Sequence, residues 1–355
     1  MFLALNEMRH SKLRYALVVG VTFLIAYLVF FLTGLSYGLA QEYQQAINKW
    51  QATDILLSDK ANDSLSMSQI NPKILDQVTA NKKAVLAQTP GIIIDSKDDQ
   101  KKQNVSFFGI DAGQFLRPNI IEGKLFQTRG DVVADKSLET RYGYQLGDKV
   151  RLATNDQTLT IVGFTDQAKF SVAPVLYTSL ETFQLIRNGA SMAGQQAASV
   201  NAIVTKGTAG ETAGLKNLSI GAFIYKLPGY SAQVMTFSFM IGFLVVIAAI
   251  VIGIFIYVLT MQKMAIFGVM KAQGISSGYI ARSVVAQTFV LAFTGVLAGL
   301  VATVLSALAL PDAVPFQTQP LFFAGIAVLI VVVAILGALF SVRSIVKLDP
   351  LRAIG

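Results

Sequence analysis

The sequence lacks cysteine altogether and has a single histidine, His10. The absence of cysteine excludes disulfides, zinc–thiolate sites and thiol nucleophiles. One histidine excludes metal sites built from several histidines and argues against a Ser-His-Asp triad. Charged residues make up only 14% of the chain, whereas soluble domains contain about 25%. The composition therefore excludes disordered and ordinary soluble proteins.

Long apolar runs take the place of the missing charges. Hydrophobic residues make up 53% of the chain, and the mean hydropathy is +0.55. A helix that spans a bilayer needs about 20 consecutive apolar residues. Runs of this kind predict four transmembrane helices, at 15–37, 235–260, 284–308 and 321–342.

The first run could also be a signal peptide, because Gly38-Leu39-Ala40 resembles a cleavage site. The apolar region of a signal peptide is normally about 7–15 residues long. The run from Tyr15 to Tyr37 is longer and has no break. We therefore expect a retained first helix.

The distribution of Lys and Arg predicts the orientation in the membrane. The short segments 1–14, 261–282 and 343–355 together hold nine basic and two acidic residues. Short cytoplasmic segments of membrane proteins carry such an excess of basic residues. We expect both termini in the cytoplasm of a multi-pass plasma-membrane protein, with segment 38–233 outside. A basic nucleic-acid surface would need these charges on a soluble face, so no nucleic-acid partner is predicted.

Segment 38–233 is long enough to be a whole domain, and its patterns predict the α+β class. Helical periodicity continues past the first span from Glu42 to Lys49. Alternating apolar residues predict strands, and helical spacing predicts helices near 70–82, 135–142 and 179–188. The expected strands are Val105–Ile110, Asp131–Ala134, Lys149–Ala153 and Leu159–Phe164. The charged run Lys97–Lys102 is typical of a solvated loop.

The cytoplasmic segment 261–282 contains a short amphipathic pattern. Met264, Phe267, Met270 and Lys271 recur at helical spacing, and Gly274 predicts the end of the helix. Such a helix can lie on the membrane surface. It can also dock apolar side chains into a groove of a cytosolic partner.

No nucleotide-binding or catalytic motif is present. The sequence contains neither a Gly-x-x-x-x-Gly-Lys-Ser/Thr loop nor a Gly-x-Gly-x-x-Gly loop after a strand. Nothing in segment 38–233 groups acids or hydroxyls with metal-ligand or nucleophile spacing. We therefore predict a protein that is not an enzyme, with no metal site, and any energy from ATP would come from another chain. The absence of carboxylates within the spans argues against a proton-coupled transporter.

One helix, a large extracytoplasmic domain and three further helices resemble the superfamily of macrolide exporters, lipoprotein-release permeases and FtsX, the type VII ABC transporter permeases. Phe267–Ser276, with Gly268 and Gly274, resembles the coupling-helix signature of that family. The tail Leu348–Arg352, together with Glu122–Phe126 and Leu146–Val150, carries further likeness. Ile266-Phe267 stands where many relatives have an acidic residue. In this respect the chain resembles the HrtB subgroup, haem-efflux permeases of Gram-positive bacteria, and also cyanobacterial glycolipid exporters. Its opening residues resemble HrtB as well.

The resemblance implies a permease homodimer that works with two copies of a separate cytosolic ATPase. ATP-driven closure would pass through the coupling helix to the first two helices and move the outer domain, which is called mechanotransmission. The chain would hold no cofactor of its own, and haem would be expelled from the outer leaflet as substrate. The same layout could instead serve an amphipathic peptide, antibiotic or lipid. A different class is a relay like FtsX that activates a cell-wall hydrolase without transport.

A haem site needs flat apolar walls, an axial ligand and a partner for the propionates. Since His10 lies on the expected cytoplasmic side, outer-side ligands would be Tyr, Met or Glu. The candidates on the two outer helix ends are Tyr27, Phe30, Phe31, Tyr37, Glu42, Tyr43, Tyr230, Met235, Phe239 and Met240. Tyr and Phe at this depth can equally form an ordinary aromatic belt. Gly34 and Gly38 could allow close helix approach, and Lys226 could pair with a propionate or simply reach toward water.

Overall fold

The computed structural model describes residues 12–189, 199–311 and 313–346, with side chains described as far as residue 340. His10 and the tail Leu348–Arg352 lie outside these residues. The chain divides into two compact units. The membrane unit comprises residues up to Gly38 and from Val234 onward, and the α/β domain comprises Leu39–Gln233.

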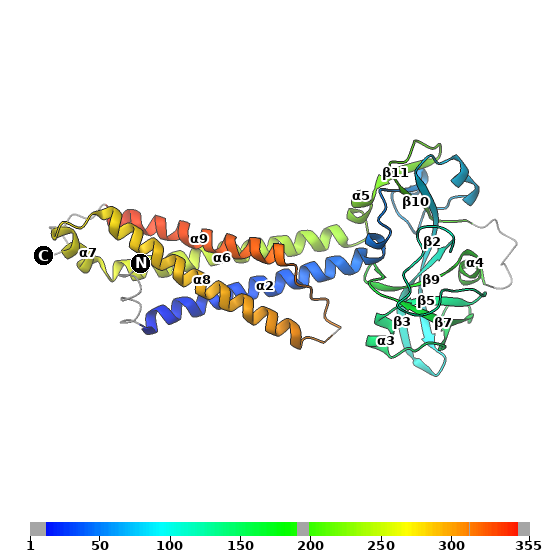
Figure 1. The fold of residues 1–355 in the computed structure, drawn as a ribbon, viewed down its shortest axis with the longest axis horizontal. Helices are drawn as coiled ribbons and strands as arrows, with labels where there is room; N and C mark the ends of the chain where they lie inside the picture. The colour runs from blue at the N-terminus through cyan, green and yellow to red at the C-terminus, as the bar shows by residue number, and fades with distance from the viewer. Residues whose placement is uncertain (1–11, 190–198, 312, 347–355) are drawn as a thin grey trace. The chain divides into compact units, whose positions relative to one another are not determined.

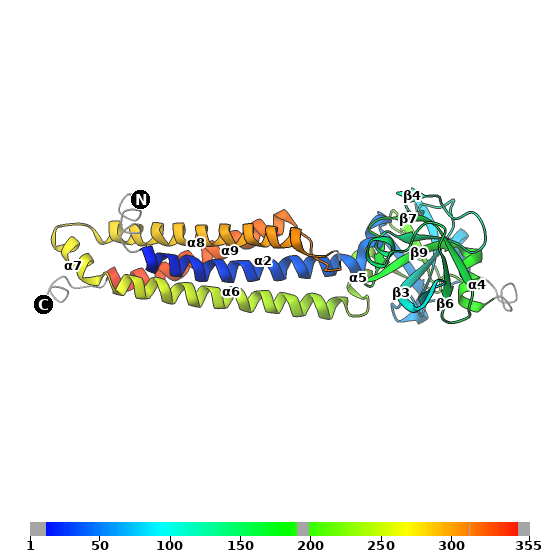
Figure 2. The ribbon, with the colours of Figure 1, turned by 90° about the horizontal axis from the view of Figure 1, so that it is seen from below.

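Four long apolar helices make up most of the membrane unit, which confirms the predicted fold class. Each is long and apolar enough to cross a membrane. They are α2 (Lys12–Lys49), α6 (Tyr230–Met261), α8 (Ser277–Ala309) and α9 (Pro320–Val346), and the short α7 (Met264–Ala272) follows α6. The long helices lie side by side in both views (Figures 1 and 2). Their shared core contains Phe30, Ile252, Leu291 and Ala334.

Two glycines of α8 bring it close to α2. A Cβ at Gly295 would lie 2.7 Å from the Thr22 side chain, and a Cβ at Gly299 would lie 2.9 Å from the Cβ of Ala26. Small residues at this four-residue spacing let helix backbones approach closely in membranes. Gly34 and Gly38 of α2 also meet a close neighbour. This neighbour is the loop around Pro315 and Phe316 rather than a helix.

The α/β domain is built on one mixed, mostly antiparallel sheet. Its strands follow the order β11-β1-β10-β2-β3-β9-β5-β7-β4, with β6 beside β2 and β7 and β8 beside β9. The pairs β3–β9 and β5–β7 are parallel. The strands are β1 (Asp54–Ser58), β2 (Lys82–Asp95), β3 (Asp98–Ile110), β4 (Glu122–Gly123), β5 (Asp131–Asp135), β6 (Lys149–Leu152), β7 (Thr158–Thr165), β8 (Lys169–Phe170), β9 (Ala173–Ser179), β10 (Ala202–Lys206) and β11 (Leu215–Ser219). The helices are η1 (Asp59–Ala61), η2 (Pro72–Gln77), α3 (Ser137–Tyr142), α4 (Leu180–Asn188) and α5 (Ile220–Tyr225).

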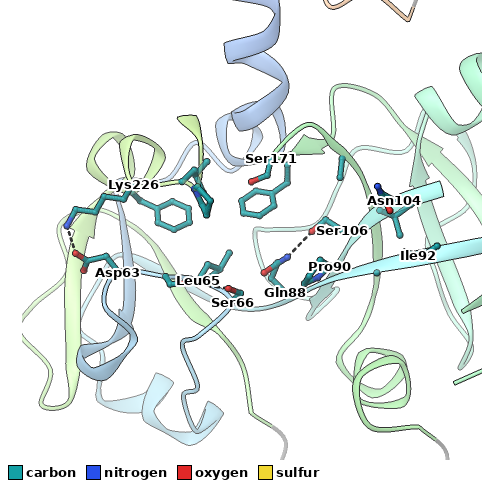
Figure 3. Close-up of a pocket in the computed structure, with 18 of the residues that line it drawn as sticks. Asp63, Leu65, Ser66, Gln88, Pro90, Ile92, Asn104, Ser106, Ser171 and Lys226 are labelled. Atoms are coloured by element: carbon teal, nitrogen blue, oxygen red, sulfur yellow. Dashed lines mark hydrogen bonds and ion pairs between the residues drawn. The ribbon is translucent and has the colours of Figure 1, made fainter. Parts of the chain in front are cut away.

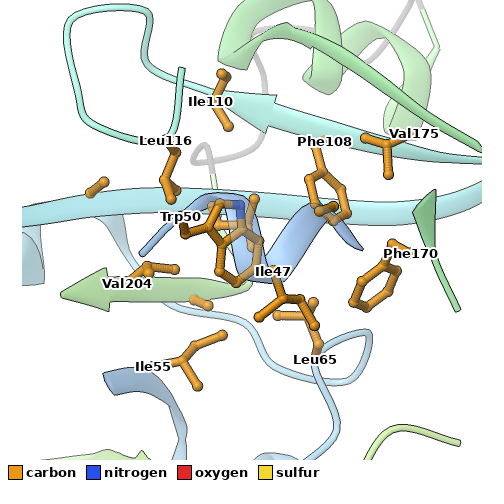
Figure 4. Packing of buried hydrophobic residues seen from close by; sticks show 14 of the residues in the cluster. Ile47, Trp50, Ile55, Leu65, Phe108, Ile110, Leu116, Phe170, Val175 and Val204 are labelled. Carbon is orange, nitrogen blue, oxygen red and sulfur yellow. The ribbon is translucent and has the colours of Figure 1, made fainter. Parts of the chain in front are cut away.

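Each face of this sheet has its own core. Alternate residues of a strand point to opposite faces, so Leu86 and Phe108 belong to one cluster while Ala87 and Phe107 belong to the other. The cluster of Leu86 and Phe108 also takes in Trp50 from the chain just after α2 (Figure 4). The last turns of α2 are therefore part of the domain core.

The structure contains the four predicted strands, and α3 and α4 lie in two of the three predicted helical segments. The predicted helix at 70–82 is wrong. The segment contains no α-helix but a six-residue 3-10 helix, η2, at Pro72–Gln77, and Lys82 begins strand β2. The predicted loop at Lys97–Lys102 is also wrong, because only residues 96 and 97 form the turn of a long β2–β3 hairpin. Cross-strand pairing of Asp98 and Lys102 with β2 outweighs the low strand preference of charged residues.

Candidate functional site

The aromatic candidates on α2 pack against neighbours within the same chain. Phe30 is fully buried, and the others are half-buried. Each one contacts a side chain of α8, of α9 or of the loop between them. The ring centroids lie 5.5 Å apart for Phe30 and Phe323, 5.5 Å for Phe31 and Phe316, and 5.9 Å for Tyr37 and Phe322. The side-chain oxygens of Tyr27 and Ser306 lie 3.1 Å apart. These rings therefore stabilise the helix bundle of one chain.

The candidates on α6 have a different environment. Met235, Phe239 and Met240 are exposed, as is Phe243 one turn further on. Their spacing places them along one side of α6. Among the described residues, no ring contact or hydrogen bond joins them to the aromatic side chains of α2. Met235, Phe239 and Met240 are therefore predicted site residues whose side chains are accessible on the surface of the membrane unit.

Glu42 lies in a buried ion-pair cluster of the α/β domain. Glu42 and Lys169 are each 5% exposed and pair directly, and Arg141 Nη2 lies 3.2 Å from Glu42 Oε1. The next residue, Tyr43, packs edge-on against Tyr230 at 5.7 Å between ring centroids. The structure therefore brings Tyr43 and Tyr230 together. The carboxylate of Glu42, in contrast, is already paired with Lys169 and Arg141.

A polar cluster at the other end of the bundle was not predicted. Lys263 Nζ lies 2.6 Å from the hydroxyl of Tyr15, and the Gln287 amide also donates to that hydroxyl. Arg14 donates to Gln262 at 2.8 Å. These bonds link the start of α2, the end of α6 and α8 just beside α7. Gln287, a polar residue inside an apolar run, is the one sign of this cluster in the sequence. Its partner Tyr15 lies far away in the chain, so the sequence pattern does not indicate the contact.

The short helix α7 forms as predicted and ends before Gly274, which has φ +86°. Its predicted apolar stripe, however, faces the bundle. Phe267 is 4% exposed and belongs to the membrane core, Gly268 is buried and Met270 packs beside that core. Met264 and Lys271 are half-buried.

The apolar side chains that α7 presents outward are different ones. Ile266 is 55% exposed and Val269 is 47% exposed. Phe267 therefore anchors α7 to its own bundle, and Ile266 and Val269 are the side chains available to a partner. The sequence pattern could not separate these two faces, because α7 is apolar on nearly all sides.

No group of three or more His, Cys, Asp or Glu that could hold a metal ion occurs in the part of the chain that the structure describes. The chemistry available at the candidate sites is therefore apolar contact, thioether and phenol ligation, and ion pairing.

Comparisons with known families cover most of the chain. The MacB-like periplasmic core domain matches residues 15–214, which is more than half of the chain. The FtsX-like permease C-terminal domain matches residues 238–350.

Similar proteins of known sequence match over their full length. A protein of Staphylococcus haemolyticus named "Putative hemin transport system permease protein HrtB" is 27% identical over 360 residues, covering 100% of this chain and 99% of that protein. One of the same name from Staphylococcus epidermidis is 25% identical over 357 residues, with the same coverage. An uncharacterized ABC transporter permease of Mycobacterium bovis is 23% identical over 364 residues, again with the same coverage.

Two solved structures overlap with part of the chain. The extracellular domain of the noncanonical ABC-type transporter YknZ from Gram-positive bacteria has a TM-score of 0.32 at 12% identity, covering 45% of this chain and 84% of that one. The periplasmic region of MacB from Actinobacillus actinomycetemcomitans has a TM-score of 0.34 at 12% identity, covering 48% and 89%.

Proposed function

Because this chain belongs to the FtsX/MacB-type family of ABC permeases, whose members lack an ATPase domain, we propose that it is the membrane subunit of an exporter that expels haem from the outer leaflet. The family implies an ATPase partner subunit. The observation that carries the haem assignment is the end-to-end similarity to proteins named as hemin permeases. Both termini lie in the cytoplasm, and two permeases work with two ATPases.

The exposed side of α6 is the surface that would receive haem. Phe239 offers a flat apolar wall, and the sulfurs of Met235 and Met240 can serve as axial ligands. In a homodimer two copies of this surface would face one another. Tyr27, Phe30, Phe31 and Tyr37 support the site from behind by packing α2 against α9 and the loop before it.

The ATPase would act on the membrane unit through α7. Ile266 and Val269 would contact the ATPase, and Phe267 would pass its movement to the bundle in which it is buried. The polar cluster of Tyr15, Lys263 and Gln287 would keep α2, α6 and α8 moving together.

The test is a haemin titration of the permease and its ATPase in nanodiscs, following the Soret band and ATP hydrolysis together. We expect a saturable band and stimulated hydrolysis. Met235→Leu and Met240→Leu preserve side-chain volume and remove a possible ligand, so each should weaken haemin binding about tenfold. The matched control is Met261→Leu, an exposed methionine near the other end of α6, which should change nothing.

Each other outcome points to another function. Stimulation by an amphipathic peptide or lipid without a Soret band would contradict haem export and indicate the alternative substrates. No stimulation by any amphiphile, with an intact ATPase complex, would instead favour a relay to a cell-wall hydrolase, the class to which FtsX belongs.

A further inference from the structure

A cavity of about 990 Å³ lies within the α/β domain (Figure 3). Small-molecule sites in proteins are typically about 300–1,000 Å³. The register of the β2–β3 hairpin pairs Pro90 with Ser106 and Ile92 with Asn104. Directly paired residues of antiparallel strands point to the same face, so these four side chains and Gln88 form the floor of the cavity.

The floor lies on the same face of the β2–β3 hairpin as one of the domain cores, beyond the part that this core covers. On the same face of the hairpin, Leu86 and Phe108 belong to the core cluster that also contains Ile47 and Trp50. Figure 4 shows Phe108, Ile47 and Trp50 within this cluster. Two residues further along each strand, the face turns polar at Gln88 and Ser106. The domain therefore has room above a sheet face that its own core does not fill.

Apolar side chains of the same core cluster form one part of the cavity wall. They comprise Leu65, Phe170, Phe223 and Leu227. An apolar molecule in the cavity would remain in contact with the domain core and would remove these side chains from water.

The floor presents the side-chain oxygen of Gln88 to the cavity. Gln88 is 6% exposed, and its side-chain nitrogen donates to Ser106 Oγ at 3.0 Å. The Gln88 side-chain oxygen accepts no hydrogen bond from the residues that the structure describes, and it is not among the fully buried atoms without a partner. It therefore reaches the open cavity, where water or a ligand can donate a hydrogen bond to it. The floor therefore favours a ligand with a polar group.

Asp63 and two lysines form an ion-pair cluster at the rim of the cavity. Asp63 pairs with two lysines, Lys216 at 2.7 Å and Lys226 at closer range. Hydrogen bonds from Lys216 and Lys226 hold the pKa of Asp63 below its ordinary value. One carboxylate between two ammonium groups leaves one positive charge in excess, and Lys226 is the lysine that lines the cavity (Figure 3).

We propose that this cavity binds a carboxylate-bearing amphiphile, with its apolar body against Leu65, Phe170 and Phe223 and its carboxylate at Lys226. The cavity shares no residue with the proposed haem surface of Met235, Phe239 and Met240, so this proposal does not depend on haem being the exported substrate. A porphyrin and a fatty acid share this chemistry, and the experiment distinguishes them.

The chain contains one tryptophan, Trp50, which lies in the core cluster that forms part of the cavity wall. Its fluorescence therefore reports on the cavity. Two probes are titrated into the full-length protein in nanodiscs: metal-free protoporphyrin IX and the fluorescent fatty acid cis-parinaric acid. We expect saturable quenching of Trp50 by at least one of them. The probe that binds shows whether the cavity takes a porphyrin or a fatty acid.

The two lysines provide a matched pair of variants, since both contact Asp63 and only Lys226 lines the cavity. Lys226→Gln should weaken binding of the acid about tenfold, because a charge-assisted hydrogen bond is lost. It should leave binding of protoporphyrin dimethyl ester unchanged. Lys216→Gln removes the excess charge of the cluster but no group that lines the cavity, so it should weaken binding of the acid less than Lys226→Gln does and should not alter binding of the ester. Equal losses in both lysine variants, or an equal loss for the ester, would overturn the carboxylate contact.

A second pair of variants tests the cavity itself. Asn104→Phe places a ring over the floor from an exposed position, and it should abolish quenching by acid and ester alike. Gln100→Phe lies at an exposed position of the same strand outside the cavity, and it should have no effect. Unchanged quenching in both Asn104→Phe and Lys226→Gln would place the probe elsewhere and overturn the proposal. Loss of the Soret band in Met235→Leu with normal Trp50 quenching would keep the two proposals distinct.

Discussion

At the scale of single residues, charge burial decides what several candidate side chains do. Glu42 lies at the expected outer depth for a haem ligand, but it is surrounded by Lys169 and Arg141. A buried carboxylate is tolerated only when cations and hydrogen bonds compensate for its lost hydration. Its main role is therefore in the stability of the α/β domain.

Glu42→Gln tests this assignment. The substitution leaves the buried ammonium of Lys169 without its carboxylate, so the free energy of unfolding of the domain should fall by about 3–5 kcal/mol. The measurement is denaturant unfolding followed by Trp50 fluorescence. The double variant Glu42→Leu with Lys169→Met should recover most of the loss. A normal stability with a lost haemin band would instead make Glu42 a ligand.

Asp166 connects the end of α2 to the domain and gives a pH prediction. Hydrogen bonds from Lys49 and Asn119 lower the pKa of Asp166. A carboxyl with a lowered folded pKa stabilises the fold above its ordinary value of about 3.9 and loses this contribution as the pH falls. Domain stability should therefore fall below about pH 4.

Asp166→Asn should reduce this dependence, so that the variant is less stable than the parent at pH 7 and the difference narrows toward pH 3. The unfolding midpoint is measured by Trp50 fluorescence across that range. Glu211→Gln, an exposed acid of the same domain, is the control. A pH profile of Asp166→Asn parallel to the parent would contradict the prediction.

At the scale of elements, α7 has two apolar sides, one packed against the helix bundle and one exposed. Phe267 is buried in the bundle, whereas Ile266 and Val269 are exposed. An exposed apolar pair on a short cytoplasmic helix is suited to a groove of a partner. The side that anchors the helix and the side that faces outward are one residue apart in the sequence.

Ile266→Asn and Val269→Asn should each reduce capture of the ATPase about tenfold, since each removes an apolar contact at the partner surface. The measurement is quantitative co-purification from membranes. Phe267→Leu is the control: it should lower the stability of the membrane unit by about 1 kcal/mol and preserve capture. Capture lost in Phe267→Leu but retained in the other two variants would reverse the assignment of the two sides.

At the scale of the whole molecule, the two units have separate cores. The membrane unit closes around Phe30, Ile252 and Leu291, and the α/β domain has one core on each face of its sheet. Units with separate cores are expected to unfold in separate transitions. A defect in the helix packing should therefore leave the domain transition in place.

Gly299→Ala tests this separation. The added methyl would meet Ala26 and the backbone of Tyr27 closer than 3.0 Å, so we expect a loss of about 1–3 kcal/mol in the membrane unit. Gly325→Ala, where nothing lies within 4 Å, is the control with the same gain in helix propensity. Circular dichroism should show the shift, and Trp50 fluorescence should not. A shift of both signals would indicate one cooperative unit.

The sequence by itself determined the class of this protein. Spans of α2, α6, α8 and α9 are evident because a helix in lipid satisfies its own backbone hydrogen bonds, so composition and length suffice. The short strands could also be predicted from the sequence, because alternation of apolar and polar residues is a local pattern. The missing ATP-binding loop and the coupling-helix pattern are also local signals.

Only the tertiary structure decided which side chains meet. The charged residues of Lys97–Lys102 lie in a hairpin because β2 pairs with them. Phe267 faces the bundle because α7 packs onto it, and Glu42 pairs with a lysine far along the chain. The cavity beside Gln88 and Lys226 depends on the register of two strands and on which part of their face the core covers. Contacts between distant residues follow from packing of the whole chain, and no local pattern encodes them.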